Sequence, residues 1–74
     1  MSNDLTIQTD RGPLSLPPGS TLADAVAALL AQSGQDPAGV ATAVNGLFVA
    51  RHAREAHHLS QGDTVLCFAP ITGG

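Results

Sequence analysis

The last residues of the sequence, Gly73 and Gly74, have the clearest potential for chemistry. Gly74 carries the terminal α-carboxylate, and neither glycine surrounds that group with a side chain. Without Cβ atoms, this backbone can lie extended in a groove too narrow for any other residue. The preceding Ile71 and Thr72 are β-branched and stiff, which confines flexibility to the tip. The pattern predicts a flexible tail, residues 70–74, that can be threaded into an enclosed site.

The composition describes a small acidic domain over residues 1–74. The 74 residues are 43% hydrophobic, which suits one folded core. The net charge is −3, with three arginines and no lysine, so nucleic acid and anionic membranes are poor partners. The longest apolar run, Ala25 to Ala31, is too short to span a bilayer, and the polar start is unlike a secretory signal. We expect a cytoplasmic domain that is monomeric when free.

A hairpin opens the chain. Residues 5–8 alternate apolar and polar side chains, which predicts a strand with Leu5 and Ile7 facing inward. Residues 10–12 have the composition of a turn, with Gly12 available for a positive φ angle, and residues 14–16 alternate again. The two segments therefore predict a β-hairpin.

A helix follows the hairpin, with Thr21 as its N-cap and Asp24 near the positive end of its dipole. Gly34 is placed to cap the C-terminus, and Pro37 prevents the helix from resuming. Five apolar residues recur at helical spacing and form one stripe, namely Leu22, Ala25, Val26, Leu29 and Leu30. This stripe predicts that the helix lies on a sheet.

Strand-like segments return in the second half of the chain. They span residues 40–44, 47–50 and 64–69. Asn45-Gly46 predicts a tight turn between the first two, because both residues tolerate a positive φ. Residues 61–63 turn the chain into the last strand, whereas residues 51–58 are polar and show no clear periodicity.

The order of these elements predicts an α+β fold. A helix between a hairpin and later strands crosses one face of the sheet, right-handed by the usual rule. The last strand is apolar at successive positions, as expected for a central strand beside the first one. We therefore expect a β-grasp architecture, with a mixed sheet of about four or five strands wrapped around one main helix.

The chain resembles the ThiS family of ubiquitin-like sulfur carriers over nearly its whole length. The residues that carry the resemblance are Val44-Asn45-Gly46, Val49-Ala50-Arg51, Leu59, Gly62-Asp63 and Ile71-Thr72-Gly73-Gly74. The family commonly has proline before the arginine and a tryptophan shortly after it. Here Ala50 precedes Arg51, and the chain has no tryptophan, with Arg54 near the expected place.

The resemblance implies a role in thiamine biosynthesis. An ATP-using enzyme related to ubiquitin-activating enzymes would adenylate the Gly74 carboxylate. Sulfur from a persulfide enzyme would then displace AMP, and thiazole synthase would use the resulting Gly74 thiocarboxylate to build the thiazole ring. Ile71, Thr72 and Gly73 would thread into these enclosed sites. The chain would thus be a co-substrate and not an enzyme, with no cofactor bound to it and ATP used by its activating partner.

The resemblance also assigns the two faces of the last strand, which alternate along it. It implies that Val65, Cys67 and Ala69 face the core. The intervening side chains would then lie on the open face of the sheet and form a docking surface for partners. We predict a partner-binding patch made of Leu66, Phe68, Phe48, Val49 and Arg51.

Other reactive side chains have simpler interpretations. Cys67 in the middle of a strand is expected to be a small buried hydrophobe rather than a persulfide site. Asp63 beside Gly62 is expected to serve the turn. The histidines are expected to be solvated rather than metal ligands, and the charged residues of the same loop to form a solvated face. These residues are His52, His57, His58, Arg51, Arg54 and Glu55.

Three alternatives remain at this point. The chain could serve the molybdopterin pathway, whose carriers are similar, although the short link from residue 35 to residue 39 favours the thiamine branch. It could be a ubiquitin-like modifier conjugated to targets through Gly74. It could also be an interaction module whose chain end is frayed and has no chemical role.

Overall fold

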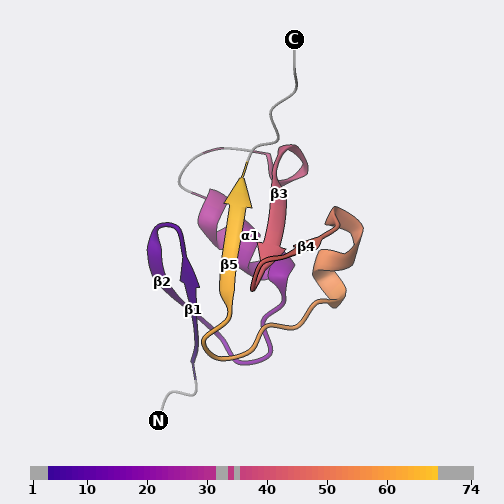
Figure 1. Cartoon of the computed structure of the whole chain (residues 1–74). Coiled ribbons are helices and arrows are strands. Elements are labelled where there is room, and N and C mark those ends of the chain that lie inside the picture. Colours follow the sequence, from indigo (N-terminus) through magenta and orange to yellow (C-terminus); the bar gives the residue numbers. More distant parts are fainter. Residues whose placement is uncertain (1–3, 32–33, 35, 69–74) are drawn as a thin grey trace.

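The computed structural model describes residues 4–31, 34 and 36–68, and within them it shows a five-stranded mixed sheet with one main helix on one face (Figure 1). The strands and helices are β1 (Leu5–Thr9), β2 (Gly12–Leu16), α1 (Leu22–Leu30), η1 (Pro37–Gly39), β3 (Ala41–Val44), β4 (Leu47–Val49), η2 (Arg51–Ala56) and β5 (Thr64–Phe68). The two elements labelled η are 3₁₀ helices. Among the described residues, none of the helices is both long enough and apolar enough to cross a membrane.

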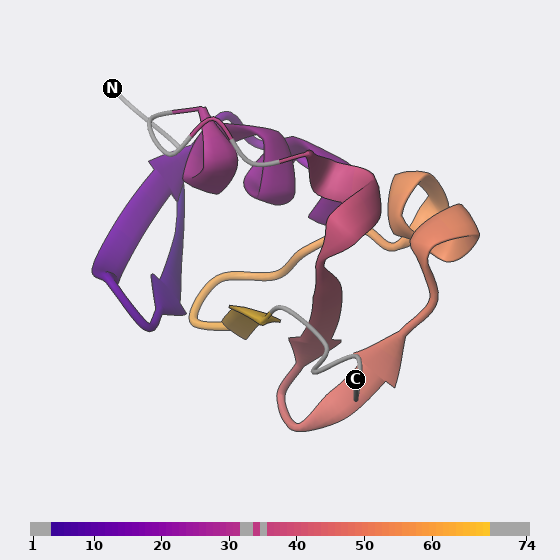
Figure 2. The ribbon, with the colours of Figure 1, turned by 90° about the horizontal axis from the view of Figure 1, so that it is seen from above.

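The strand order is β2-β1-β5-β3-β4. β5 pairs parallel to β1 and antiparallel to β3, so the last strand is central and lies beside the first. Figure 2 shows the sheet curving around α1, with the β1–β2 hairpin at one edge and β4 at the other. This arrangement confirms the predicted β-grasp fold.

Turn residues fix the first hairpin as predicted. Gly12 has φ +101°, a conformation that side-chain-bearing residues rarely adopt. The register pairs Leu5 with Leu16, and both of these side chains are buried, as is Ile7. The hairpin also reaches the end of the helix, because Arg11 Nη1 donates a 2.9 Å hydrogen bond to the carbonyl of Leu29. A cation at this end of a helix complements the dipole.

A complete capping box starts α1. The Thr21 side chain accepts a hydrogen bond from the Asp24 amide, and the Asp24 carboxylate accepts one from the Thr21 amide. The helix ends at Leu30, and Gly34 (φ +72°) donates its N–H to the Leu30 carbonyl at 3.1 Å. All five residues of the predicted apolar stripe are buried.

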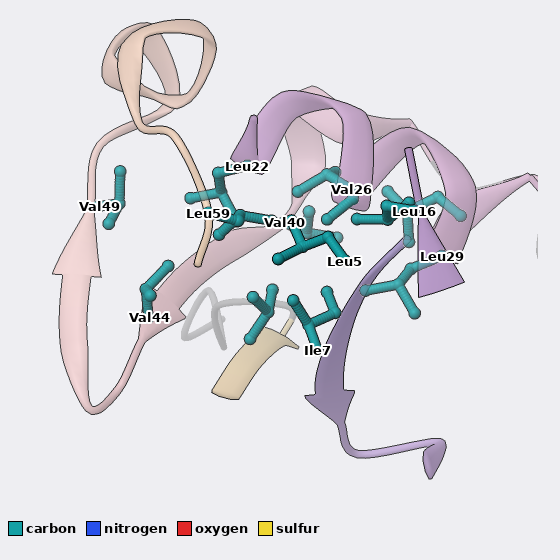
Figure 3. Close-up of a cluster of buried hydrophobic side chains, with 13 residues drawn as sticks. Leu5, Ile7, Leu16, Leu22, Val26, Leu29, Val40, Val44, Val49 and Leu59 are labelled. Atoms are coloured by element: carbon teal, nitrogen blue, oxygen red, sulfur yellow. The ribbon is translucent and has the colours of Figure 1, made fainter. Parts of the chain in front are cut away.

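The core lies between α1 and the concave face of the sheet. Leu22, Val26 and Leu29 of the helix face Leu5 and Ile7 of β1 (Figure 3). Further buried side chains come from the later strands and from the loop before β5, namely Val40, Val44, Val49, Leu59 and Val65. Burial of this apolar surface is the main force that holds the helix on the sheet.

The segment after β4 differs from the sequence-based prediction. Residues 51–58 were expected to be an irregular polar loop, but Arg51–Ala56 form the 3₁₀ helix η2 beside α1. Arg54, expected on a solvated face, is only 4% exposed. Arg54 can be buried because carbonyl groups from distant segments accept its hydrogen bonds. The periodicity of the local sequence carries no information on such contacts.

Arg54 donates three hydrogen bonds. Its Nε binds the Thr42 hydroxyl at 3.1 Å, its Nη1 binds the Pro37 carbonyl at 3.0 Å, and its Nη2 binds the Val40 carbonyl at 2.6 Å. Thr42 is itself fully buried and donates its hydroxyl to the carbonyl of Val49 in β4. One guanidinium therefore connects η2 to η1, to β3 and, through Thr42, to β4.

Two turns are clasped together at the start of β5. Asn45 and Gly46 both have positive φ, 53° and 84°, as the predicted tight turn requires. Asn45 Nδ2 donates to Asp63 Oδ1, and Asn45 Oδ1 accepts the Thr64 amide, both at 3.0 Å. Asp63 Oδ2 also accepts the Ser60 amide at 2.8 Å. The hydrogen bond from Ser60, and after it the one from Asn45, lower the pKa of the Asp63 carboxyl.

We predict that Arg54→Met lowers the free energy of unfolding by about 2–3 kcal/mol. The substitution leaves two backbone carbonyls and a buried hydroxyl without their donor, and relief of the buried charge offsets part of that cost. Arg51→Met, on the exposed start of the same 3₁₀ helix, is the matched control and should change stability by no more than about 0.5 kcal/mol. Urea unfolding followed by circular dichroism measures both; equal losses would contradict a special role for Arg54.

The clasp predicts a dependence of stability on pH. Because the folded-state pKa of Asp63 is lowered, its contribution is present above the unfolded value, near 3.8, and is lost as pH falls through the folded value. Asp63→Asn should therefore destabilise the protein at pH 7 by about 1 kcal/mol or less, since solvent screens the group. The difference between wild type and variant should shrink below about pH 4. Urea midpoints at pH 7 and pH 3 give the comparison, and a constant difference would refute the linkage.

Candidate functional site

The predicted reactive tail lies outside the described residues, which end at Phe68. This applies to Ile71, Thr72, Gly73 and Gly74, and also to Ala69, which was expected to face the core. Of the predicted site, the structure therefore describes β5, which precedes the tail, and the sheet surface around that strand. β5 is the central strand of the sheet: its start pairs with β1 at Thr64 and Val65, and its pairing with β3 continues to Phe68, the last described residue before the tail.

An apolar face lies on the side of the sheet opposite α1, and we define it as Leu66, Phe68 and Phe48. The register pairs Ala43 with Leu66 on one side and with Phe48 on the other, so the three side chains share one face. Leu66, Phe68 and Phe48 are 38%, 49% and 68% exposed. Ala41 and Ala43 of β3 share this face and are half-buried, so the small side chains of β3 lie between the larger ones of β5 and β4.

The opposite side of β5 belongs to the core, as predicted. Val65 is completely buried, and Cys67 is half-buried and packs against the core cluster. Burial raises the pKa of the Cys67 thiol, and the charge of Arg54 offsets this only in part. A raised pKa keeps the thiol protonated and poorly nucleophilic, which agrees with a packing role for this cysteine.

Val49 was predicted to belong to the partner-binding patch, and the structure contradicts its placement there. Val49 pairs with Thr42, faces the core and is 9% exposed. The two-residue turn at residues 45–46 pairs Val44 with Leu47, and this register places Phe48 opposite Ala43 on the open face and Val49 opposite Thr42 on the core face. Leu47 is 73% exposed but lies on the side of Val44, away from the apolar face. Arg51, also named in the patch, is exposed at the start of η2.

The apolar face carries no formal charge. The described strands contain no Asp, Glu, Lys, Arg or His, so every charged side chain of the described chain lies on a helix, turn or loop. The β1–β2 half of the same face presents uncharged polar side chains such as Thr6 and Gln8. The surface next to the tail is thus suited to a partner that buries apolar area rather than one that pairs charges.

The histidines of the η2 region do not converge. His52 and His58 are exposed, and His57 is half-buried and contributes its backbone, whose carbonyl accepts the Leu22 amide at 2.8 Å. Within residues 4–31, 34 and 36–68, no three His, Cys, Asp or Glu side chains are grouped so that they could hold a metal ion.

The fold and the open apolar face define a ubiquitin-like β-grasp domain. The chain belongs to the ThiS family, whose sequence profile matches residues 8–74. A crystal structure of the thiamine biosynthesis protein ThiS from Geobacter metallireducens matches with a TM-score of 0.76 and 21% identity, covering 95% of this chain and all of that one. Ubiquitin from Caldiarchaeum subterraneum matches with a TM-score of 0.63 and 15% identity, covering 96% of each chain. No curated protein matches the sequence significantly.

The two faces of β5 make a testable contrast in stability. Val65→Ala removes fully buried methyl groups and should cost on the order of 1–3 kcal/mol of unfolding free energy. Phe68→Ala removes a larger side chain that is half exposed, and should cost less than about 1 kcal/mol. Urea unfolding of both variants decides the matter; a larger loss for Phe68→Ala would mean that the faces are assigned the wrong way round.

Proposed function

We propose that this protein is a sulfur carrier whose Gly74 carboxylate is adenylated and then converted to a thiocarboxylate that supplies sulfur for thiazole formation. Membership of the ThiS family carries the proposal, because it supports a ubiquitin-like sulfur carrier of thiamine biosynthesis. The ubiquitin-like fold agrees with this role. The carrier is a co-substrate, and it works in the cytoplasm.

The chemistry needs activation because a carboxylate is a poor acyl donor. Attack of the Gly74 carboxylate on the α-phosphorus of ATP forms an acyl adenylate and releases pyrophosphate, so that AMP becomes the leaving group. The terminal sulfur of a partner enzyme's persulfide then attacks the acyl carbon and displaces AMP, which gives an acyl disulfide between Gly74 and the partner. Attack of a thiol on the partner's sulfur of that disulfide releases the Gly74 thiocarboxylate and leaves a disulfide behind. The chain itself contributes the carboxylate and a narrow approach to it, and the activating partner binds ATP. Glycine at residues 73 and 74 suits this use, since both steps enclose the tip of the chain.

The apolar face gives the partners a surface to hold while the tail is inserted. Leu66 and Phe68 belong to β5 and precede the tail by only a few residues in the sequence, so a partner bound to them needs only a short segment of chain to reach the carboxylate. We assign this face to the adenylating enzyme and to thiazole synthase. Phe68→Ala should then weaken both complexes, measured by calorimetry, more than it weakens the fold, because a half-exposed aromatic ring can anchor an interface.

Intact mass spectrometry of the protein isolated from its native host tests the function directly. A sulfur carrier gives a species in which one sulfur atom replaces one oxygen atom, and fragmentation places the change at Gly74. Large adducts instead would identify a protein modifier. An unchanged mass under thiamine-limited growth would overturn the proposal. If the Gly74 thiocarboxylate accumulates when thiazole formation is blocked, the carrier supplies sulfur to that pathway.

Gly73→Val tests whether the tail is threaded. A branched side chain next to Gly74 should abolish ATP-dependent adenylation by the activating enzyme while the circular dichroism spectrum stays unchanged. Gly39→Val is the matched control, because Gly39 lies in η1 and a Cβ there would meet no heavy atom within 4 Å. Normal adenylation of Gly73→Val, or an equal loss in Gly39→Val, would remove the threading argument.

A further inference from the structure

A pocket lies on the helix side of the domain, where α1, η1 and η2 meet. Its volume is about 180 Å³, and its lining residues are Ala23, Val26, Pro37, Arg51, Arg54 and Glu55. α1 covers the face of the sheet opposite the apolar face, so the pocket is separate from the surface that leads to the tail. An occupant of the pocket would not compete with a partner seated on Leu66 and Phe68.

The guanidinium of Arg54 borders the pocket, and none of the protein groups that bind it carries a negative charge. The three acceptors of the Arg54 guanidinium are the Thr42 hydroxyl and the carbonyls of Pro37 and Val40, all neutral oxygens. A guanidinium carries five N–H donors, so donors remain beyond these three bonds. Burial of a charge is costly unless an opposite charge compensates it. An anion in the adjoining pocket would supply that compensation.

The lining residues indicate which anion fits. Arg51 adds a second guanidinium and Glu55 adds one carboxylate, so the pocket has one excess positive charge. A single negative charge balances it, whereas a dianion would leave one negative charge in excess. The remaining wall is apolar, formed by Ala23, Val26 and Pro37, and this favours a ligand with a hydrocarbon part.

We propose that this pocket is a binding site for a small monocarboxylate with a short apolar body. Guanidinium groups match the planar carboxylate and bind it through paired hydrogen bonds. A protein cavity of roughly 150 Å³ accommodates benzene, so a pocket of about 180 Å³ has room for a carboxylate with a few carbon atoms. The site is independent of the proposed sulfur chemistry, because it includes neither the tail nor the apolar face.

An NMR titration of the full chain with isobutyrate tests the proposal. The amides of Ala23, Val26 and Arg54, and the Arg54 Nε–H, should shift together and saturate, with little change in β1 and β2. Isobutyramide has the same shape without the charge and should shift them far less at equal concentration. Equal responses to the acid and the amide would overturn the proposal, and so would the absence of saturable shifts. Phosphate that binds as tightly as isobutyrate would overturn the assignment to a monocarboxylate.

Two neighbouring exposed residues allow a test by the sign of charge. Arg51→Gln removes a charged donor and should weaken isobutyrate binding about tenfold. Glu55→Gln removes the repelling carboxylate and should tighten binding. Both positions are exposed, so both variants should keep the wild-type circular dichroism spectrum and unfolding midpoint. Two changes of affinity in the same direction, or none, would mean that these residues do not hold an anion here.

Discussion

The guanidinium of Arg54 holds together segments that are far apart in the sequence. Its acceptors come from η1, from the residue before β3 and from β3 itself, and Thr42 extends the connection to β4. Each acceptor is a polar group in or near the interior that would be costly without a donor. Hydrogen bonds from this one side chain therefore stabilise the path of the chain from η1 into the sheet. The positive charge of Arg54 also acts on Cys67 in β5, where it offsets part of the rise in the thiol pKa that burial causes.

The central position of β5 determines how the domain presents its last described residues. The start of the strand is held from both sides, because the amides of Gln8 and Asn45 bind the carbonyls of Asp63 and Thr64. The Asn45–Asp63 clasp adds side-chain hydrogen bonds at the same point. Alternation along β5 then separates the buried Val65 from the exposed Leu66 and Phe68. A strand fixed in this way can expose apolar side chains on one face while the other face completes the core.

Local patterns in the sequence were sufficient for most of the fold. Helical periodicity predicted every buried residue of α1, and turn chemistry predicted the positive φ angles of Gly12, Asn45 and Gly46. The burial of Arg54 was not predictable in this way, because its acceptors are backbone carbonyls brought near only by the tertiary fold. The error at Val49 was avoidable, since a two-residue turn at residues 45–46 already fixes which residue of β4 faces inward. The tail residues remain a prediction from sequence and family.

The absence of charged residues from the described strands has a consequence for the kinetics of recognition. Any long-range steering must come from the net charge of −3, which lies on helices, turns and loops, and not from this face itself. Contacts made on the face would gain free energy by short-range desolvation of aromatic and aliphatic surface, and that gain should vary little with salt. A face of this kind selects what it contacts by shape rather than by surface potential.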